Sequence, residues 1–262
     1  MRLVPTCSRH GRAHADWLRI DVEKPEDWAV LSTRAPRAVI YCAGICDTER
    51  CDANPEFAWT INVGGITAML DALPPSTRLV VCSSDHTFSG DGGPYLESTT
   101  PDPLGVYGRS RVEAERRVLS RRPGALVVRV ALPIGPSLSG RVGFWDWLAY
   151  RHRRDLPMTV VDGEVRAAVW SVDAARRVHA LAQSDLSGML HLAATRPSAR
   201  PALAAALCRR QGIEPRYRVV ERSRLERPHL GRVELRSERT ESLARPLIGV
   251  LDEHGALTQP SL

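Results

Sequence analysis

Lysine is almost missing from this sequence of 262 residues, because Lys24 is the single lysine and arginine supplies the other basic side chains. Long apolar runs are also missing, and none approaches the eighteen or more residues of a membrane-spanning helix. The amino terminus lacks the uninterrupted apolar segment of a signal peptide. We therefore expect a cytoplasmic protein without a membrane partner.

Cysteine pairs with metal-ligand spacing are missing as well, although the chain has six cysteines. Cys46 and Cys51 are a close pair, but no second pair elsewhere in the chain matches their spacing, so it is a poor zinc signature and we expect no metal. Cys42 and Cys82 lie in strand-like runs and Cys208 in a helix-like run. We expect these three thiols to be buried.

The charge balance is positive, with a formal net charge of +6, and it could suit nucleic acid or another polyanion. The basic residues are spread along the chain rather than gathered in one arm or stripe, so we expect no nucleic-acid partner. Hydrophobic residues make up 43% and charged residues 25% of the chain, which is ordinary for a globular domain. The positive net charge would favour binding of a phosphate-bearing small molecule.

One stretch, from Arg78 to Val118, carries most of the chemistry. Its apolar run Leu79–Cys82 predicts a buried strand, and Ser84 follows at the carboxyl end, where open α/β sheets bind ligands. A loop rich in glycine, proline and aspartate comes next. A helical pattern then begins at Tyr107, and Arg111 lies one turn further on the same helix face.

These side chains form a plausible acid/base site. The Arg111 cation favours the phenolate of Tyr107 and should lower the pKa of that phenol. The Ser84 hydroxyl could hold a substrate carbonyl against the phenol. His86 could itself move protons near neutral pH. A structural interpretation stays open, because Tyr and Arg four residues apart are common on helices and a loop histidine often faces solvent.

The segment SSDHTFSGDGGPYLE…PLGVYGRSRVEAE resembles the extended short-chain dehydrogenase/reductase family, in particular its dTDP-4-dehydrorhamnose reductase-like branch. Members read approximately STDYVFDG…PYxE…PxxxYGxSKxxGE here. The resemblance implies that Ser84 is the family's Ser/Thr, Tyr107 its catalytic tyrosine and Arg111 its catalytic lysine. Arginine is larger, planar and never deprotonated, so Arg111 departs from the pattern.

The resemblance implies an α/β fold, a Rossmann-like, mostly parallel sheet with helices on both faces and a small C-terminal substrate lobe. Residues 1–135, with parts of 155–195, would form the Rossmann-like domain, and residues 136–262 mainly the lobe. The family's first strand and its GxxGxxG loop have no counterpart near Met1. We expect the remaining strands to close up, MRLVPTC to take an unexpected slot, or another chain to supply the edge.

The resemblance also implies cofactor contacts. Ala43 and Gly44 match a strand end that lets the backbone approach the nucleotide, and Asn62 matches a position that supports the active-site backbone. Ser8 and Arg9 fall where relatives that prefer NADP hold the ribose 2′-phosphate, although a basic surface turn is the alternative. The expected cofactor is NADP or NAD, bound weakly or not at all if the phosphate loop is absent.

The implied substrate is a nucleotide-activated or phosphorylated sugar. The positions expected to contact it are Asp85, His86, Leu132, Arg166 and Arg227. Leu132 and His86 replace aromatic groups of the rhamnose-forming reductases, which argues against that particular sugar. His191 is expected to be a core residue.

Two classes of function follow. The first is an NAD(P)-dependent reductase in which Tyr107 donates the proton. The second is a relative without hydride chemistry, either an epimerase, dehydratase or cyclase that uses Tyr107, Ser84 and His86, or a non-catalytic partner. A homodimer, or a partner chain that completes the sheet, is an expected assembly.

The remaining pattern predicts further helices and strands. Helices are expected over 25–35, 54–73, 144–154 and 201–211, and strands over 38–43, 125–130, 160–172 and 188–193. The tail from residue 217 is expected to be irregular.

Overall fold

A four-stranded parallel sheet forms the centre of the molecule, in the order β10-β5-β4-β3. Its strands are β3 (Ala38–Tyr41), β4 (Arg78–Ser84), β5 (Leu126–Val130) and β10 (Gly188–Leu192). The computed structural model describes residues 4–7, 17–140 and 142–261. The strands predicted at 38–43, 125–130 and 188–193 are confirmed, and β4 continues the predicted 79–82 run as far as Ser84.

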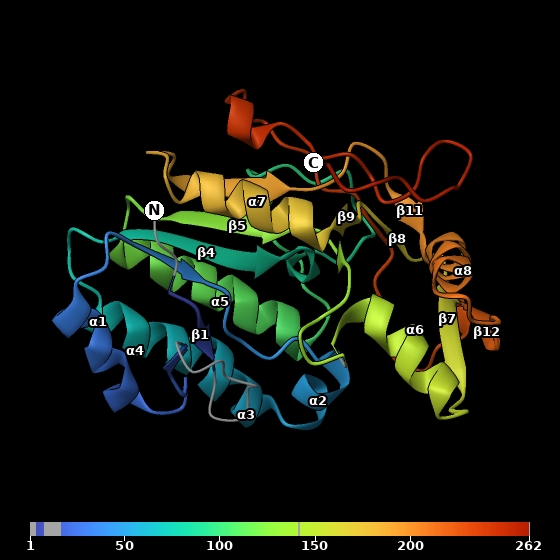
Figure 1. Cartoon of the computed structure of the whole chain (residues 1–262), viewed down its shortest axis with the longest axis horizontal. Helices are drawn as coiled ribbons and strands as arrows, with labels where there is room; N and C mark the ends of the chain where they lie inside the picture. The colour runs from blue at the N-terminus through green and yellow to red at the C-terminus, as the bar shows by residue number, and fades with distance from the viewer. Residues whose placement is uncertain (1–3, 8–16, 141, 262) are drawn as a thin grey trace.

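Helices cover both faces of this sheet, as the sequence predicted (Figure 1). One face packs on α1 (Ala29–Arg34), α4 (Gly65–Ala72) and α5 (Val106–Arg121), and the other on α7 (Ser171–Leu181). Alternate residues of β4 point to opposite faces: Leu79 and Val81 join the core under α4 and α5, whereas Val80 joins the core under α7. The period-two alternation of a strand therefore builds two separate cores.

The helix predicted over 54–73 is present, but it is composite. Asn54 caps α3 (Pro55–Trp59) by accepting the Phe57 N–H at 3.2 Å, as its place before a proline predicted. A π-helical turn, η2 (Thr60–Gly64), then joins α3 to α4. The π turn contains Asn62, and such turns cluster at functional sites.

The amino-terminal strands do not join the central sheet. β1 (Thr6–Cys7) pairs in parallel with β2 (Leu18–Arg19) as a separate two-stranded sheet. Within the described ranges β3 pairs with β4 alone and is therefore an edge strand. Part of the MRLVPTC segment thus lies beside β2, outside the central sheet. The strands of the central sheet do not close up around this segment.

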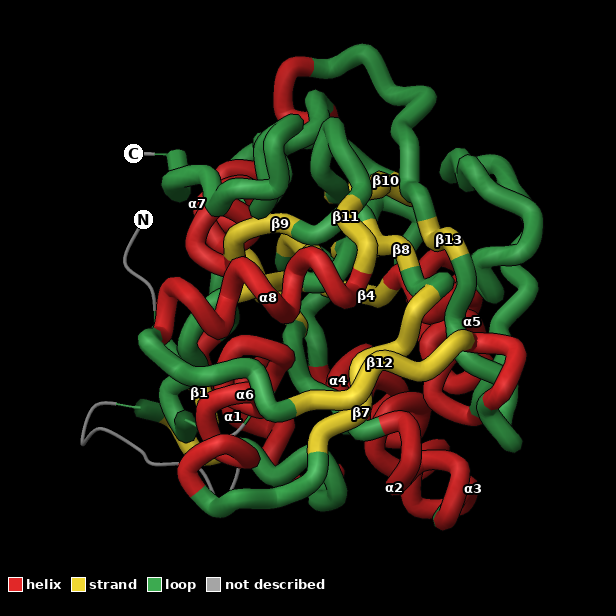
Figure 2. Tube along the Cα trace, turned by 90° about the vertical axis from the view of Figure 1, so that its right-hand side faces the viewer, coloured by secondary structure: helices red, strands yellow, loops and turns green. Residues whose placement is uncertain are grey.

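A third core lies beyond the carboxyl end of the sheet, beside the Rossmann-like part (Figures 1 and 2). It is built from α6 (Gly143–Arg153), α8 (Arg200–Gln211), β7 (Met158–Asp162) and β12 (Tyr217–Glu221), and β7 pairs in parallel with β12. Figure 2 shows α8 above this strand pair. The sequence missed β12, and the division at residue 135 stays a prediction.

Short elements connect these parts. They are η1 (Pro25–Trp28), α2 (Thr48–Ala53), η3 (Asp85–Thr87), β6 (Pro133–Ile134), β8 (Val165–Arg166), β9 (Val169–Trp170), β11 (Ser198–Ala199), η4 (Arg222–Arg224), β13 (Arg232–Val233) and η5 (Ser242–Ala244). The single strand predicted over 160–172 is thus three strands, β7, β8 and β9. In the part of the chain that the structure describes, no helix is long and apolar enough to cross a membrane.

Candidate active site

Ser84, Tyr107 and Arg111 converge at the carboxyl end of β4, as the sequence predicted. Ser84 ends β4, and Tyr107 and Arg111 lie on the first turns of α5, which packs against that strand. The Ser84 side chain is near enough to the Tyr107 phenol to lower its pKa. Ser84 and Tyr107 are each 9% exposed, so both hydroxyl groups are largely shielded from water.

The net pKa shift of Tyr107 is set by burial as well as by Arg111. Burial raises the pKa of the phenol, and the Arg111 charge and the Ser84 side chain lower it by less, so the net pKa is above its ordinary value. The predicted lowering effect of Arg111 is therefore present, but burial outweighs it. Tyr107 carries its proton at neutral pH, which suits a proton donor.

Arg111 is buried against two backbone segments. One guanidinium nitrogen donates to the Cys82 carbonyl oxygen, while the Nε hydrogen has no protein partner. A Cβ added to Gly44 would lie 3.2 Å from another guanidinium nitrogen. Arg111 therefore fills the space between the ends of β3 and β4.

The Gly44 backbone has the properties expected of a ligand contact. Gly44 is exposed at φ +151°, and a Cβ there would lie 2.8 Å from the Asn62 side-chain oxygen. Only glycine fits this position without displacing Asn62. Ala43 precedes it and is half-buried.

Asn62 supports this segment from behind. Its Oδ1 accepts the Ile45 N–H at 2.9 Å, and its Nδ2 donates to the Ile45 carbonyl at 3.1 Å and to Ser110 Oγ at 2.9 Å. The side chain is fully buried. Asn62 is thus a structural support, and its prediction as a direct cofactor contact is corrected.

His86 lies beside the phenol. Its ring meets the Tyr107 ring edge-on with the centroids 5.3 Å apart. Burial, followed by the Arg166 charge, lowers the pKa of His86 to about 4. His86 is therefore neutral at neutral pH and can hydrogen-bond a ligand without adding charge.

Two predicted substrate contacts are instead paired with each other. Arg166 Nε donates to Asp85 Oδ2 at 2.7 Å, and Arg166 also bonds Glu164 at 2.9 Å. Asp85 and Arg166 are 1% and 3% exposed. The predicted contact of Arg166 with a diphosphate is wrong, because the guanidinium is used inside the protein, and Asp85 is corrected for the same reason.

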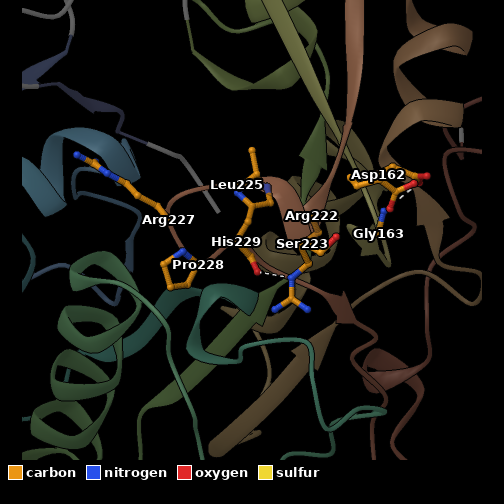
Figure 3. A pocket seen from close by; sticks show the side chains of 9 residues that line it. Asp162, Gly163, Arg222, Ser223, Leu225, Arg227, Pro228 and His229 are labelled. Atoms are coloured by element: carbon orange, nitrogen blue, oxygen red, sulfur yellow. Dashed lines mark hydrogen bonds between the residues drawn. The ribbon is translucent and has the colours of Figure 1, made fainter.

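This buried chain of charges reaches a surface cavity. Glu164 Oε2 lies 3.0 Å from His229 Nε2, and His229 lines a cavity of about 350 Å³ formed by Asp162, Gly163 and residues 221–229. Arg227 also lines the cavity, and Figure 3 shows its side chain extending away from Asp162 and Gly163. Arg227 is exposed and available to an anion.

The other predicted residues have diverse locations. Leu132 is half-buried, and its N–H donates to Asp85 at 3.3 Å. His191 is a core residue, since it is 2% exposed and its Nδ1 lies 2.9 Å from the Arg236 carbonyl oxygen. Ser8 and Arg9 lie outside the described residues.

Sequence reasoning missed Glu115. Its carboxylate accepts from Ser83 at 2.5 Å and pairs with Arg129 at 2.7 Å, and both charged side chains are buried. The spacing Tyr107, Arg111, Glu115 repeats every four residues and could have revealed it.

The cysteine predictions are partly wrong. Cys208 is buried, but Cys42 is exposed and Cys82 half-buried. β3 ends at Tyr41, one residue before Cys42, so the apolar run overstates the strand.

The fold and the site together define the class of protein. It is a short-chain dehydrogenase/reductase-type protein, with a parallel sheet covered by helices on both faces, a serine at a strand end, and a helix that carries a tyrosine and a basic residue four positions later. Residues 3–254 match the family described as the RmlD substrate binding domain, and the chain belongs to that family. The family resemblance inferred from the sequence is therefore confirmed.

This chain aligns with only part of the length of the relatives that it matches in sequence. The dTDP-4-dehydrorhamnose reductase of Mycobacterium tuberculosis is 32% identical over 199 residues, which cover 72% of this chain and 64% of the reductase. The methionine adenosyltransferase 2 subunit beta of Xenopus tropicalis is 34% identical over 108 residues, which cover 41% of this chain and 32% of that protein. The chain thus spans about one third to two thirds of these relatives.

Solved structures share the fold. A dTDP-4-dehydrorhamnose reductase from Bacillus anthracis in complex with NADP has a TM-score of 0.74 at 19% identity, covering 94% of this chain and 86% of that one. A Thermus thermophilus UDP-glucose 4-epimerase complexed with NAD has a TM-score of 0.71 at 20% identity, covering 84% and 76%. Proteins of this fold therefore bind nicotinamide dinucleotides.

Proposed function

We propose that this chain is an NAD(P)-dependent, reductase-like protein that acts on a nucleotide-activated or phosphorylated sugar. The single observation that carries the proposal is the convergence of Ser84, at the end of β4, with a protonated Tyr107 and the Arg111 charge on the first turns of α5. The family's reductases and the solved complexes with NADP and NAD support the cofactor class. Which dinucleotide is used is part of the proposal.

The residues around Gly44 fit the nicotinamide end of such a cofactor. The exposed glycine leaves room for close approach, and the Arg111 Nε hydrogen is a buried donor without a protein partner. When bound, a reduced nicotinamide supplies a hydride. Ser84 would orient the substrate carbonyl oxygen, and Tyr107 would donate its proton to that oxygen.

The substrate class is supported by the surface cavity. Arg227 lines it and is exposed, and an exposed guanidinium binds phosphate through paired N–H donors, whereas Arg222 is already paired with Asp91. The buried charges from His229 to Asp85 connect this cavity to the loop that carries His86.

A second candidate is a redox-neutral enzyme or a non-catalytic partner on the same fold that has lost dinucleotide binding. Arg111 favours it, because one guanidinium nitrogen is committed to the Cys82 carbonyl and another lies only 3.2 Å from where a Cβ on Gly44 would stand. In the family the lysine at this position also holds the nicotinamide ribose, and a planar guanidinium does not replace an ammonium there.

Calorimetric titration with NADPH and NADH separates the two candidates. Binding with a dissociation constant below about 1 mM, equivalent to roughly 4 kcal/mol, supports the reductase. The Arg116→Ala variant is the control for Arg111, because Arg116 also lies on α5 but is exposed. It should bind the dinucleotides as the wild type does. Absence of binding by both dinucleotides overturns the reductase and leaves the second candidate.

A further inference from the structure

Two cysteines face each other at the end of the central sheet. β3 and β4 are paired in parallel with Tyr41 opposite Val81, so Cys42 and Cys82 are the next residues in register. Their sulfur atoms lie 3.5 Å apart. Cys42 is two residues before Gly44, and Cys82 is two residues before Ser84.

The backbone is already suited to a covalent bond between these residues. Adjacent strands lie about 4.8 Å apart, and disulfides form when Cα atoms are roughly 4.4 to 6.8 Å apart. The two sulfur atoms must approach by about 1.5 Å to reach bonding distance. Rotation of the side chains on two neighbouring strands can supply such a movement.

The two thiols differ in reactivity. The hydrogen bond with Cys82 and the Arg111 charge lower the pKa of Cys42 against the opposing effect of burial. The pKa of Cys82 is raised well above its usual value by the same pairing and by burial. Cys42 is also the exposed member of the pair, so it is the accessible nucleophile.

We propose that Cys42 and Cys82 form a reversible intramolecular disulfide by reaction with a hydroperoxide or a low-molecular-weight disulfide. With hydrogen peroxide, the Cys42 thiolate attacks one oxygen, the O–O bond breaks, and Cys42 sulfenic acid and hydroxide result. Cys82 sulfur then attacks the Cys42 sulfur, the S–O bond breaks, and hydroxide leaves with the Cys82 proton as water. Both sulfur atoms are oxidised, and the peroxide is reduced to two molecules of water.

With a small disulfide, the Cys42 thiolate attacks one of its sulfur atoms and releases a thiolate. Cys82 then displaces the second small thiol from Cys42, and the protein disulfide forms. Two thiols of the reagent are produced for each bond made. An excess of the reduced reagent reverses both steps.

Neighbouring cysteines are poorer partners. Cys46 is exposed, but burial raises the pKa of its thiol. Cys51 is fully buried in α2, and burial raises its pKa to about 11. Cys208 is buried in α8, which belongs to the third core. Among the cysteines whose side chains the structure describes, the bond should therefore be selective for Cys42 and Cys82.

The test uses the reduced full-length protein treated with hydrogen peroxide and, separately, with oxidised glutathione. Thiol titration and intact mass under native conditions should show the loss of two thiols and of two hydrogen atoms, and dithiothreitol should restore both. Peptide mapping should join the Cys42 and Cys82 peptides. The Cys46→Ser variant should behave as the wild type, whereas Cys42→Ser and Cys82→Ser should each abolish the bond.

Circular dichroism of the variants confirms that they are folded. A mapped bond between Cys42 and Cys46, an unchanged thiol count after oxidation, or a bond that persists in Cys82→Ser would overturn the proposal. None of these readouts depends on dinucleotide binding or sugar chemistry, so the inference stands or fails independently of the proposed function.

Discussion

Tyr107 shows how burial and charge compete at a single residue. The sequence places a cation one helical turn away, and this alone predicts a lower pKa for the phenol. The structure adds burial, which has the larger effect, so the pKa is raised. The direction of the pKa shift could not be predicted from the sequence, because burial of the phenol depends on how α5 packs against η3.

The acid role of Tyr107 gives a first prediction. If Tyr107 donates the proton, reductive turnover falls by roughly 10² to 10⁴-fold in Tyr107→Phe while dinucleotide binding is retained. Because the pKa of the phenol is raised above 10, the ionised form appears only at high pH, and the rate attributable to this donor should fall only above about pH 10.

The measurement is the pH dependence of kcat in a reductase assay with dinucleotide consumption as readout. A loss of rate centred between pH 6 and 8 that persists in Tyr107→Phe would assign the proton to another group. Full activity of Tyr107→Phe would remove the acid role altogether.

Arg166 shows a second limit of sequence reasoning at this scale. Arginine in a predicted lobe suggested a phosphate ligand, yet Asp85 and Glu164 surround it in the structure. Asp85 lies 81 residues away in sequence, so no local pattern reveals the pair. By contrast, Ser84, Tyr107 and Arg111 were found because a strand end and a helix turn are local features.

Helix α5 is the element on which the site depends, and its first turn packs very closely on η3. A Cβ added to Gly108 would lie 2.2 Å from the His86 carbonyl oxygen and 2.7 Å from Pro103 Cβ. Both distances are shorter than real contacts, so a side chain at this position must push α5 away from His86.

Gly108→Ala should therefore destabilise the protein by about 1 to 3 kcal/mol, the usual cost of overpacking. Chemical denaturation followed by circular dichroism measures the change. Gly124→Ala is the matched control, because a Cβ there has no neighbour within 4 Å. Equal stability of the two variants would contradict the close packing of α5 on η3.

The middle of α5 is fixed by the buried pair of Glu115 and Arg129, whose side chains are 3% and 4% exposed. Glu115→Gln leaves the arginine charge without its partner, which should cost about 3 to 5 kcal/mol of unfolding free energy. Glu113→Gln on the same helix should cost less than about 1 kcal/mol, because its partner Arg116 is exposed.

Denaturant unfolding of both variants tests this contrast. Similar losses for the two substitutions would show that Glu115 does not anchor the helix.

Most elements of the fold were predictable because their signals are local. The Asn54-Pro55 pair predicted the start of the helix that ends at Ala72, and the apolar runs predicted β3, β4, β5 and β10. β12 was missed because its burial pattern is mostly exposed, so its sequence lacks the apolar run of a central strand. The π turn was missed because one extra residue in a helix leaves no compositional mark.

The whole molecule should lose stability on acidification. Burial lowers the pKa of His191 to about 4, whereas an unfolded histidine titrates near 6.5. Between these values the unfolded chain binds more protons, so the unfolding free energy falls as the pH is lowered from 6.5 to 4, by up to about 3 kcal/mol for this histidine.

Unfolding at a series of pH values measures this slope. His191→Asn should make it shallower, with the part due to His86 remaining, and His254→Gln, at an exposed histidine, should leave it unchanged. An identical slope in His191→Asn and the wild type would contradict the assignment.

The contact between His229 and Glu164, and the ion pairs of Arg166 with Glu164 and Asp85, join the cavity wall to the loop at the end of β4. Glu164, Arg166 and Asp85 are nearly inaccessible to water, so each buried charge is compensated by the opposite charge of its neighbour. A molecule that displaces His229 must disturb Glu164, and the disturbance passes inward to the residue before His86. We expect binding in the cavity to change the position of the loop that carries His86.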